Sequence, residues 1–342
     1  MVGRRMRWIA AAAVMMATTA CGGGSSTQRV DLHGAGASFP FPLYDRWFKD
    51  YSAAHATVRV DYQSVGSGAG ITQFTNHTVD FGASDAAMTD EEIAKVDRGV
   101  QLVPMTAGSI VLAYNLPALT APLRLSRRAY TGIFLGTIKK WNDAAIAAAN
   151  PGVKLPALDI TVVHRADSSG TTFVFTQHLS AISPEWKAGP GTSKDPNWPV
   201  GVGSKGNEGV TSTIQQTPGA LGYVEYGYAK QSNLPMAALE NHSGAFVEAS
   251  TASGQAALAA AQLPENLRLF IPDPDGEDSY PIVTYTWLLL YQHYDNAATS
   301  AALKDVVRYA LSDGQQVSES MGYIPLPPSV VAADLAALDR VQ

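Results

Sequence analysis

Cysteine is nearly absent from this chain of 342 residues, in which Cys21 is the single example. One thiol excludes a disulfide within the chain and any zinc or iron–sulfur site built from several cysteines. The 7 histidines are scattered and form no His-Glu-x-x-His pattern, so we expect no metal site. Basic residues are also few, since 24 of them stand against 30 acidic residues and leave a net charge of −6. This balance argues against a nucleic-acid partner, which would require a basic face.

After the first twenty residues, the chain has no long apolar run. No segment there reaches the length of about 20 residues that spans a bilayer. The chain is nevertheless 46% hydrophobic, which excludes a disordered or collagen-like protein. Its length exceeds the roughly 250 to 300 residues at which a single core stops growing. We therefore expect a globular protein of two domains.

Residues 1–20 form a predicted signal peptide. Arginines in the first seven positions precede an apolar stretch over 8–17 and a short run of small residues. Cys21 then stands where bacterial lipoproteins carry their acylated cysteine, and residues 21–29 read as a flexible tether. Thr18 departs from the leucine that such signals usually have. Lipidation at Cys21 and simple cleavage beside an incidental cysteine both predict export.

Alternating strand and helix patterns follow in the mature chain. The segment 57–62 alternates with period two, and four aromatic residues between positions 44 and 51 recur at helical spacing. Further strands are expected at 109–115, 159–165, 221–228 and 282–291, and helices at 143–150, 172–181, 209–216, 299–312 and within 243–262. The near-continuous apolar character of these strands is typical of α/β sheets covered by helices.

Four segments rich in small residues carry the candidate chemistry. GAGASF at 34–39, GSGAG at 66–70 and RADSSGT at 165–171 each lead into a predicted helix, and DFGASD at 80–85 reads as a short apolar turn ending in an acid. A helix N-terminus offers unpaired backbone amides, so three such segments together could hold an anion. Each segment alone is weak evidence, because a turn of glycine and serine before a helix is more often an ordinary structural cap.

Competing motifs fail on spacing. A dinucleotide fingerprint would need glycine where Phe39 stands, and GSKG at 203–206 lacks the Gly-Lys-Ser/Thr of a phosphate-binding nucleotide loop. Ser169 lacks the first glycine of a G-x-S-x-G elbow and a histidine that could act as its base. His164 is interpreted as a packed neighbour of the arginine that follows it. We therefore expect no cofactor.

Five motifs occur in the order typical of one family. They are GAGASFP at 34–40, DFGASD at 80–85, IKKW at 138–141, RADSSGT at 165–171 and PGALGYVEY at 218–226. The sequence resembles the periplasmic phosphate-binding proteins of the phosphate-specific ABC transporter. The likeness runs from about 32 to 234 and returns at about 280 to 330.

The resemblance implies an α/β protein with the two-domain periplasmic-binding-protein fold (type II-like). Its ligand would lie in a cleft between domains that are joined by two crossover strands and close by a hinge. Carried over, the first domain covers 30–113 plus 283–342, and the second covers 114–282. The implied partners are inorganic phosphate and the permease subunits of an ABC transporter.

The family's phosphate contacts carry over one position at a time. The matching residues are Ser38, the backbone amide of Phe39, Ser67, Asp85, Arg165, Ser169, Gly170 and Thr171. Asp167 takes the place of the acid that pairs with the arginine and orients it. Position 38 is often threonine in the family, and serine keeps the hydroxyl.

Asp85 and Arg165 also make chemical sense without the family. One arginine, several hydroxyls and helix-end amides could replace the water around a phosphate. Phosphate keeps at least one proton at neutral pH and sulfate has none. A buried Asp85 could therefore accept a hydrogen bond from the P–OH group and repel sulfate. Two structural alternatives remain open. Asp85 could cap a helix over 88–96, although Thr89 suits that position better, and Arg165 could serve an ion pair with Asp167.

The predicted function is capture of inorganic phosphate outside the inner membrane and its delivery to an ABC permease, with no catalysis. A receptor for another tetrahedral oxyanion, such as sulfate or arsenate, is the alternative within the same class. A phosphatase or phosphotransferase would use Ser169 as nucleophile, but no group is placed to activate it. A structural or adhesive surface protein would leave Asp85 and Arg165 without a role.

Overall fold

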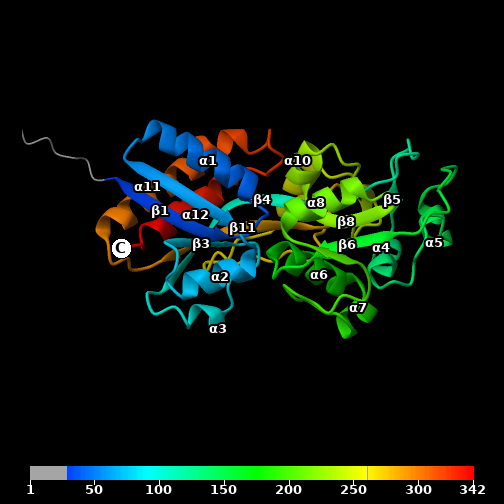
Figure 1. The fold of residues 1–342 in the computed structure, drawn as a ribbon, viewed down its shortest axis with the longest axis horizontal. Helices are drawn as coiled ribbons and strands as arrows, with labels where there is room; N and C mark the ends of the chain where they lie inside the picture. The colour runs from blue at the N-terminus through cyan, green and yellow to red at the C-terminus, as the bar shows by residue number, and fades with distance from the viewer. Residues whose placement is uncertain (1–28, 260) are drawn as a thin grey trace, which may run out of the picture.

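The computed structural model describes residues 29–259 and 261–342 (Figure 1). The predicted signal peptide over 1–20, Cys21 and nearly all of the tether lie outside the described residues. Within the described part of the chain, no helix combines the length and the apolar character needed to cross a membrane.

A mixed eight-stranded sheet runs through the described residues in the order β2-β1-β3-β11-β4-β8-β6-β7. Its strands are β1 Val30–Gly36, β2 Val58–Ser64, β3 Phe81–Ser84, β4 Val100–Tyr114, β6 Thr161–Arg165, β7 Val202–Ser204, β8 Ala220–Glu225 and β11 Val283–Tyr291. Parallel pairing joins β1 to β2 and β3, and β6 to β7 and β8, whereas β11 runs antiparallel to both of its neighbours. A small separate sheet contains β5 Arg124–Leu125, β9 Ala238–Glu240 and β10 Phe246–Val247. The predicted α/β class is confirmed.

Two lobes share the large sheet, the first built around β1, β2, β3 and β11 and the second around β6, β7 and β8 (Figure 1). Strand β4 belongs to both, because its residues 100–109 pair with β11 and its residues 110–114 pair with β8. At the transition the Ile110 amide donates to the Ile282 carbonyl at 2.9 Å, directly before β11 begins. Strand β4 and the adjacent segment that leads into β11 therefore connect the lobes, in agreement with the two crossovers that the resemblance implied.

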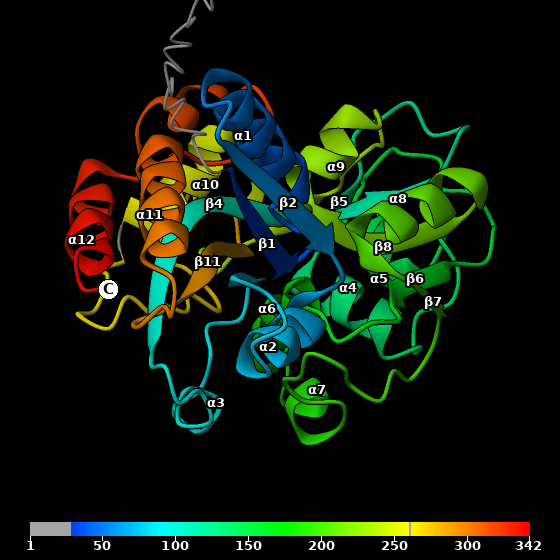
Figure 2. The same ribbon diagram turned by 60° about the vertical axis from the view of Figure 1, so that its left-hand side comes forward.

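Helices cover both faces of each lobe (Figure 2). The helices of the first lobe are α1 Phe41–Ala54, α2 Ser67–Thr75, α3 Asp90–Ile93, α11 Ala297–Leu311 and α12 Pro328–Leu338, together with the 3-10 helix Asp313–Val317. Those of the second lobe are α4 Arg127–Phe134, α5 Ala144–Ala149, α6 Gly170–Ile182, α7 Pro184–Ala188, α8 Gly206–Gln216 and α9 Tyr226–Gln231. Helix α10 Thr251–Ala259 lies within the helix expected in 243–262 and packs on β4 and β11.

The aromatic stripe predicted for 44–51 forms the buried face of α1. Tyr44, Trp47, Phe48 and Tyr51 are all buried. The Trp47 indole donates to the Gly314 carbonyl at 2.6 Å, so its one polar atom is satisfied. Burying each such side chain contributes on the order of 2 kcal/mol, which fixes α1 on the sheet at the point where its N-terminus faces the second lobe.

Two expectations about local structure were wrong. Residues 80–85 were expected to form a turn, but 81–84 form the buried strand β3, because β1 and β11 pair with it on either side. The strand expected over 221–228 ends at Glu225, whose carboxylate accepts the amide protons of Gly227 and Tyr228 and so starts α9. The first change affects the site, since Asp85 directly follows the last residue of β3.

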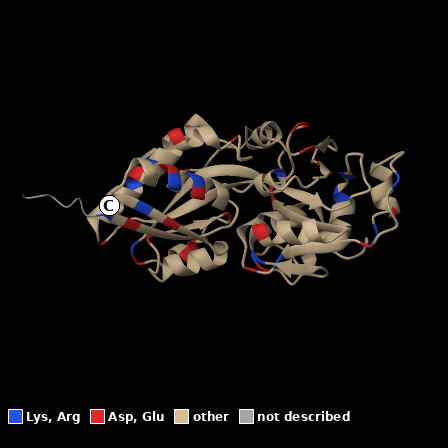
Figure 3. Ribbon diagram, turned by 45° about the horizontal axis from the view of Figure 1, so that its top comes forward, with Lys and Arg blue, Asp and Glu red and all other residues tan. Residues whose placement is uncertain are grey.

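Charged residues lie mostly on the helices, the edge strand and the loops, and the middle of the sheet carries few of them (Figure 3). Asp85 and Arg165 are exceptions, with only 1% and 2% of their surfaces exposed. Burying a charge is unfavourable unless it finds partners, so these two side chains require compensating contacts.

Candidate functional site

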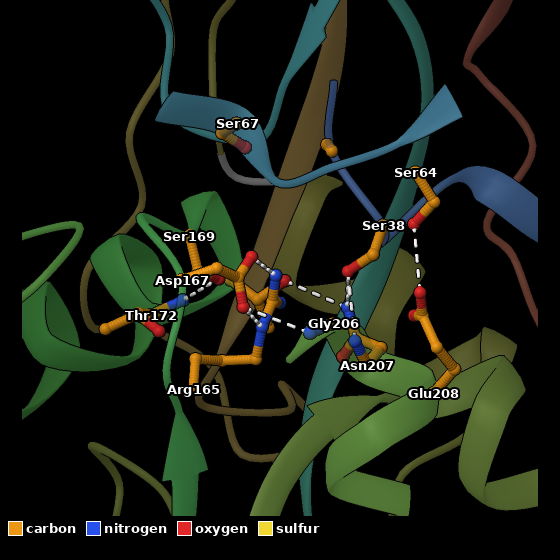
Figure 4. Close-up of polar contacts among 12 residues, drawn as sticks. Ser38, Ser64, Ser67, Arg165, Asp167, Ser169, Thr172, Gly206, Asn207 and Glu208 are labelled. Atoms are coloured by element: carbon orange, nitrogen blue, oxygen red, sulfur yellow. Dashed lines mark hydrogen bonds and ion pairs between the residues drawn. The ribbon is translucent and has the colours of Figure 1, made fainter. Parts of the chain in front are cut away.

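Arg165 is the last residue of β6, and a bidentate ion pair fixes its side chain. Its Nε donates to Asp167 Oδ1 at 2.8 Å and its Nη2 donates to Oδ2 (Figure 4). Burial opposes the charge on Asp167, but the bond and the charge from Arg165 outweigh it and hold the pKa of Asp167 below its ordinary value. The remaining nitrogen, Nη1, is buried and has no hydrogen-bond partner among the described residues. A strong, oriented donor is therefore left for an anion.

Asp85 follows β3 and receives several hydrogen bonds. The Thr286 hydroxyl donates to its Oδ1 at 2.8 Å, and the Thr171 hydroxyl donates to its Oδ2 at 3.2 Å. Burial raises the pKa of Asp85 to about 7, against the opposing effects of the Thr286 bond, the Arg165 charge and the Thr171 bonds. A carboxyl group in this state can change its charge near neutral pH.

The helix-cap alternative for Asp85 is not what the structure contains. Thr89 caps α3 instead, since its hydroxyl accepts the Glu92 amide proton at 3.2 Å while the Glu92 carboxylate accepts the Thr89 amide proton at 2.9 Å. This reciprocal capping box leaves Asp85 free of a capping role.

The N-terminus of α6 lies beside Asp85. Ser169 is its cap and accepts the Thr172 amide proton at 3.0 Å. The amides of Gly170 and Thr171, the first two residues of the helix, have no intrahelical acceptor. A β-carbon on Gly170 would lie 2.4 Å from the Ser67 hydroxyl oxygen, so only glycine permits this close approach between the lobes.

The loops of the first lobe bring hydroxyls to the same place. Ser38 and Phe39 lie between β1 and α1, and both are buried. Their carbonyls accept protons from tyrosine hydroxyls, Tyr228 for Ser38 at 2.7 Å and Tyr323 for Phe39 at 2.8 Å. Ser67, the first residue of α2, accepts the Asp85 amide proton at 3.2 Å.

Direct contacts link four of the predicted site residues across the two lobes. Ser67 contacts Asp85, and Asp85 contacts Thr171, while Gly170 packs against Ser67. Six of the side chains, those of Ser38, Ser67, Asp85, Arg165, Ser169 and Thr171, are no more than 2% exposed. The arrangement therefore offers one unpaired guanidinium nitrogen, helix-end amides and hydroxyls, together with one carboxyl, to a small anion that enters without its water.

Comparison with known proteins places the chain in a family. A family model described as a PBP superfamily domain matches residues 22–314. The phosphate-binding protein PstS of Xylella fastidiosa (strain Temecula1) is 42% identical over 308 residues, covering 89% of this chain and 84% of that protein. PstS of Haemophilus influenzae is 42% identical with coverages of 89% and 91%, and PstS of Methanocaldococcus jannaschii is 36% identical with coverages of 92% and 87%. The chain belongs to the phosphate-binding protein family.

Solved structures of phosphate-binding proteins share the fold. An ancestral soluble variant of the human phosphate-binding protein superposes with a TM-score of 0.74 at 22% identity, covering 90% of this chain and 93% of that one. A phosphate-binding protein from Stenotrophomonas maltophilia gives a TM-score of 0.73 at 20% identity, with coverages of 90% and 94%. The two-domain periplasmic-binding-protein fold is therefore confirmed.

Two residues at the start of α8 were missed by the sequence reasoning for this member of the phosphate-binding family. The Gly206 amide donates to Asp167 Oδ1 at 3.0 Å, and Asn207 contacts both Ser38 and Thr171. The helix had been expected to begin at Gly209, which placed both residues in a loop. The available signal was a further glycine between a strand and a helix, at the GSKG segment that was considered only as a nucleotide loop.

Thr286 was also missed, because it lies within β11 and no motif marks it. Its importance depends on a pairing with β3, two hundred positions earlier in the chain, that no local pattern reveals.

His164 packs as expected, with its ring stacked on Trp198 at a centroid distance of 4.7 Å. Among the described residues, no three side chains of His, Cys, Asp or Glu gather into a group that could hold a metal ion.

Proposed function

We propose that this protein captures inorganic phosphate between its two lobes and delivers it to an ABC permease for import. The observation that carries this proposal is the buried Arg165 Nη1, which has no partner among the described residues and lies in a site lined by helix N-termini. Membership of the phosphate-binding protein family supports the same ligand, since relatives at 36% to 42% identity carry that name.

The proposed ligand contacts are the residues that the two lobes bring together. Ser38, the amide of Phe39, Ser67 and Asp85 come from the first lobe, and Arg165, Ser169, Gly170 and Thr171 come from the second. Asp167 orients Arg165 and takes no direct part. Donors dominate this set, which suits an anion that accepts hydrogen bonds through all of its oxygens.

Asp85 provides the discrimination between phosphate and sulfate. Phosphate at neutral pH carries at least one proton and can donate it to the carboxylate, whereas sulfate has no proton to donate. Sulfate would face the ionised Asp85 with no proton between the two negative charges, which costs several kcal/mol. A pKa of about 7 means that this exclusion operates above neutral pH.

Capture requires the lobes to open and close, and the domain boundaries proposed for this motion are 30–113 plus 283–342 and 114–282. A closed state gains contacts from both lobes, so phosphate shifts the population toward it. The stretch after α10 touches both sides, since Arg268 donates to the Met88 carbonyl at 3.1 Å and Arg127 pairs with Asp273 at 2.7 Å.

The protein is proposed to work outside the inner membrane, in the periplasm or its equivalent, and to be anchored through a lipid on Cys21. Its partners would be the permease subunits of the ABC transporter. The support for export is the signal-peptide pattern over 1–20, and the support for the permease is membership of the family.

A catalytic role for Ser169 is disfavoured by its position. Its hydroxyl accepts the Thr172 amide proton as a helix cap, and no histidine or carboxylate of the described residues hydrogen-bonds to it. We expect no release of phosphate from a chromogenic ester by the wild-type protein. Turnover that disappears in Ser169→Ala would overturn the assignment as a binding protein.

Calorimetric titration tests the proposal directly. The protein starting at Gly22, freed of bound phosphate, should bind one phosphate with an affinity that excess sulfate leaves unchanged. An arsenate and sulfate competition series distinguishes a phosphate receptor from a receptor for another tetrahedral oxyanion. No heat with phosphate, in protein shown to be free of ligand and folded, would contradict the proposal.

A further inference from the structure

Asn207, the second residue of α8, joins the two lobes at the centre of the site. It is completely buried, and both its backbone amide and its Nδ2 donate to the Ser38 hydroxyl oxygen, at 3.0 and 2.9 Å (Figure 4). The same Nδ2 lies 3.2 Å from the Thr171 hydroxyl oxygen. One side chain thus contacts a proposed phosphate ligand from each lobe.

The orientation of the Asn207 amide group is fixed from its other end. Its Oδ1 accepts the Glu225 amide proton at 2.9 Å, which a backbone N–H can only donate. The opposite end of the amide must therefore be the NH2 group, so Nδ2 faces Ser38 and Thr171 as a donor. Gly206, with a φ of +70°, supplies the backbone turn that directs α8 and Asn207 toward the site.

These contacts determine what the Ser38 hydroxyl can do. A hydroxyl has one proton to donate and two lone pairs that accept, and both of the acceptor positions on Ser38 are taken by the two nitrogens of Asn207. Its proton must then point away from Asn207. The hydroxyl can then donate a hydrogen bond to an anion in the site. The alternative orientation, in which Ser38 turns a lone pair toward the anion, is prevented.

The Thr171 hydroxyl is ordered in a related way. It accepts from Asn207 Nδ2 and donates to Asp85 Oδ2 at 3.2 Å. Asn207, Thr171 and Asp85 therefore form a chain of hydrogen bonds from α8 to the end of β3, and this chain exists only when the lobes are together.

We propose that Asn207 is a positioning residue, which orients the Ser38 hydroxyl as a donor to phosphate and couples that orientation to closure of the lobes. The inference rests on the proposed phosphate function. It assigns to Asn207 no bond to phosphate, so its effect on affinity must pass through Ser38 and, to a smaller degree, through Thr171.

A double-mutant cycle tests the proposal. Phosphate affinity is measured by calorimetry for wild type, Asn207→Ala, Ser38→Ala and the double variant. Each single change should weaken binding roughly tenfold, as expected for loss of one hydrogen bond to a charged ligand. The double variant should be no more than about twofold weaker than the weaker single variant, because both changes remove the same donor. Additive losses would overturn the proposal, since a structural role acts independently of Ser38.

An isosteric variant gives a second readout that does not depend on a cavity. In Asn207→Asp the carboxylate accepts the Ser38 proton and turns it away from the anion. Phosphate binding should weaken by at least about tenfold more than in Asn207→Ala, and the loss should diminish as the pH falls and the new carboxyl protonates. Equal affinities of Asn207→Asp and wild type would contradict the inference.

Asn241 supplies the matched control. It is also completely buried, and its Nδ2 contacts three carbonyls remote from the site, those of Gly276, Glu277 and Ser279. Asn241→Ala should lower the free energy of unfolding and leave phosphate affinity unchanged. A wild-type protein that binds no phosphate would sink the proposed function, whereas wild-type binding with an unaffected Asn207→Ala would sink this inference alone.

Discussion

Two buried aspartates in the first lobe have contrasting surroundings. Asp85 receives hydrogen bonds from Thr286 and Thr171, and its pKa rises to about 7 because burial outweighs these bonds. Asp334, on α12, is completely buried, and both of its carboxyl oxygens lack a partner among the described residues. Burial alone raises its pKa to about 9.

The difference shows how a protein makes a buried carboxyl useful. Without donors Asp334 stays neutral at physiological pH and serves as an uncharged polar group in an apolar setting. The donors around Asp85 lower the cost of its charge just enough for it to ionise near neutrality. A group in that range can accept a proton from one anion and reject another, which Asp334 could not do.

Replacing Asp334 should give the largest effect. Because its pKa is raised in the folded state to about 9, the folded protein binds a proton that the unfolded chain has released, and stability falls as the pH rises from roughly 4 to 9. Asp334→Asn removes the contribution of Asp334 to this slope, which is about 1.4 kcal/mol for each pH unit in that window. Urea unfolding of the phosphate-free protein at pH 5 and pH 8 measures it. Parallel pH profiles for variant and wild type would show that Asp334 ionises freely when folded.

Replacing Asp85 should change specificity, and it should also remove the smaller fall in stability that its raised pKa gives between roughly pH 4 and pH 7. Above pH 7 the wild type should exclude sulfate, and as the pH falls through about 7 the carboxyl protonates and the exclusion is lost. Asp85→Asn should bind sulfate roughly 10- to 100-fold more tightly than wild type at pH 8, with little dependence on pH. Calorimetric competition between phosphate and sulfate at several pH values gives both quantities. Undiminished sulfate exclusion in the variant would remove Asp85 from the discrimination mechanism.

The smallest effect is expected from a variant in which Asp85 loses one hydrogen-bond donor and so comes to resemble Asp334, which has none among the described residues. Thr286→Val removes the donor to Asp85 Oδ1 and keeps the shape of the side chain, so the pKa of Asp85 should rise further. The pH at which sulfate exclusion disappears should move upward by roughly one unit. Thr284→Val is the control, since Thr284 lies two residues earlier in β11, is buried, and donates to the Tyr285 carbonyl. An unchanged midpoint in Thr286→Val would mean that its hydrogen bond does not tune the acid.

Local patterns in the sequence were enough to predict the α/β class, most of the helices and the longer strands except β1, whereas the short strands of the described residues were not predicted. The site residues that lie in short contiguous motifs were also found, because a glycine or serine at a helix start has a local cause. Arg165 and Asp167 are two positions apart, so even their ion pair could be anticipated from the chain itself.

The residues that were missed depend on contacts between distant parts of the chain. Segment 81–84 is too short for its sequence pattern to predict a strand, and it forms one because β1 and β11 pair with it. Thr286 matters only because that pairing places it beside Asp85. Asn207 looks like an ordinary residue of a helix start until the lobes meet and bring Ser38 to it.

The position of β11 has a consequence for the order in which the molecule can be built. Its residues 283–291 lie between β3 and β4, in the middle of the sheet, although they come late in the chain. A nascent chain that has reached α10 still has open edges on β3 and β4, which would be exposed to wrong pairings. Such non-local pairing also slows folding. The first lobe therefore cannot be completed until the strand that fills this gap has been synthesised.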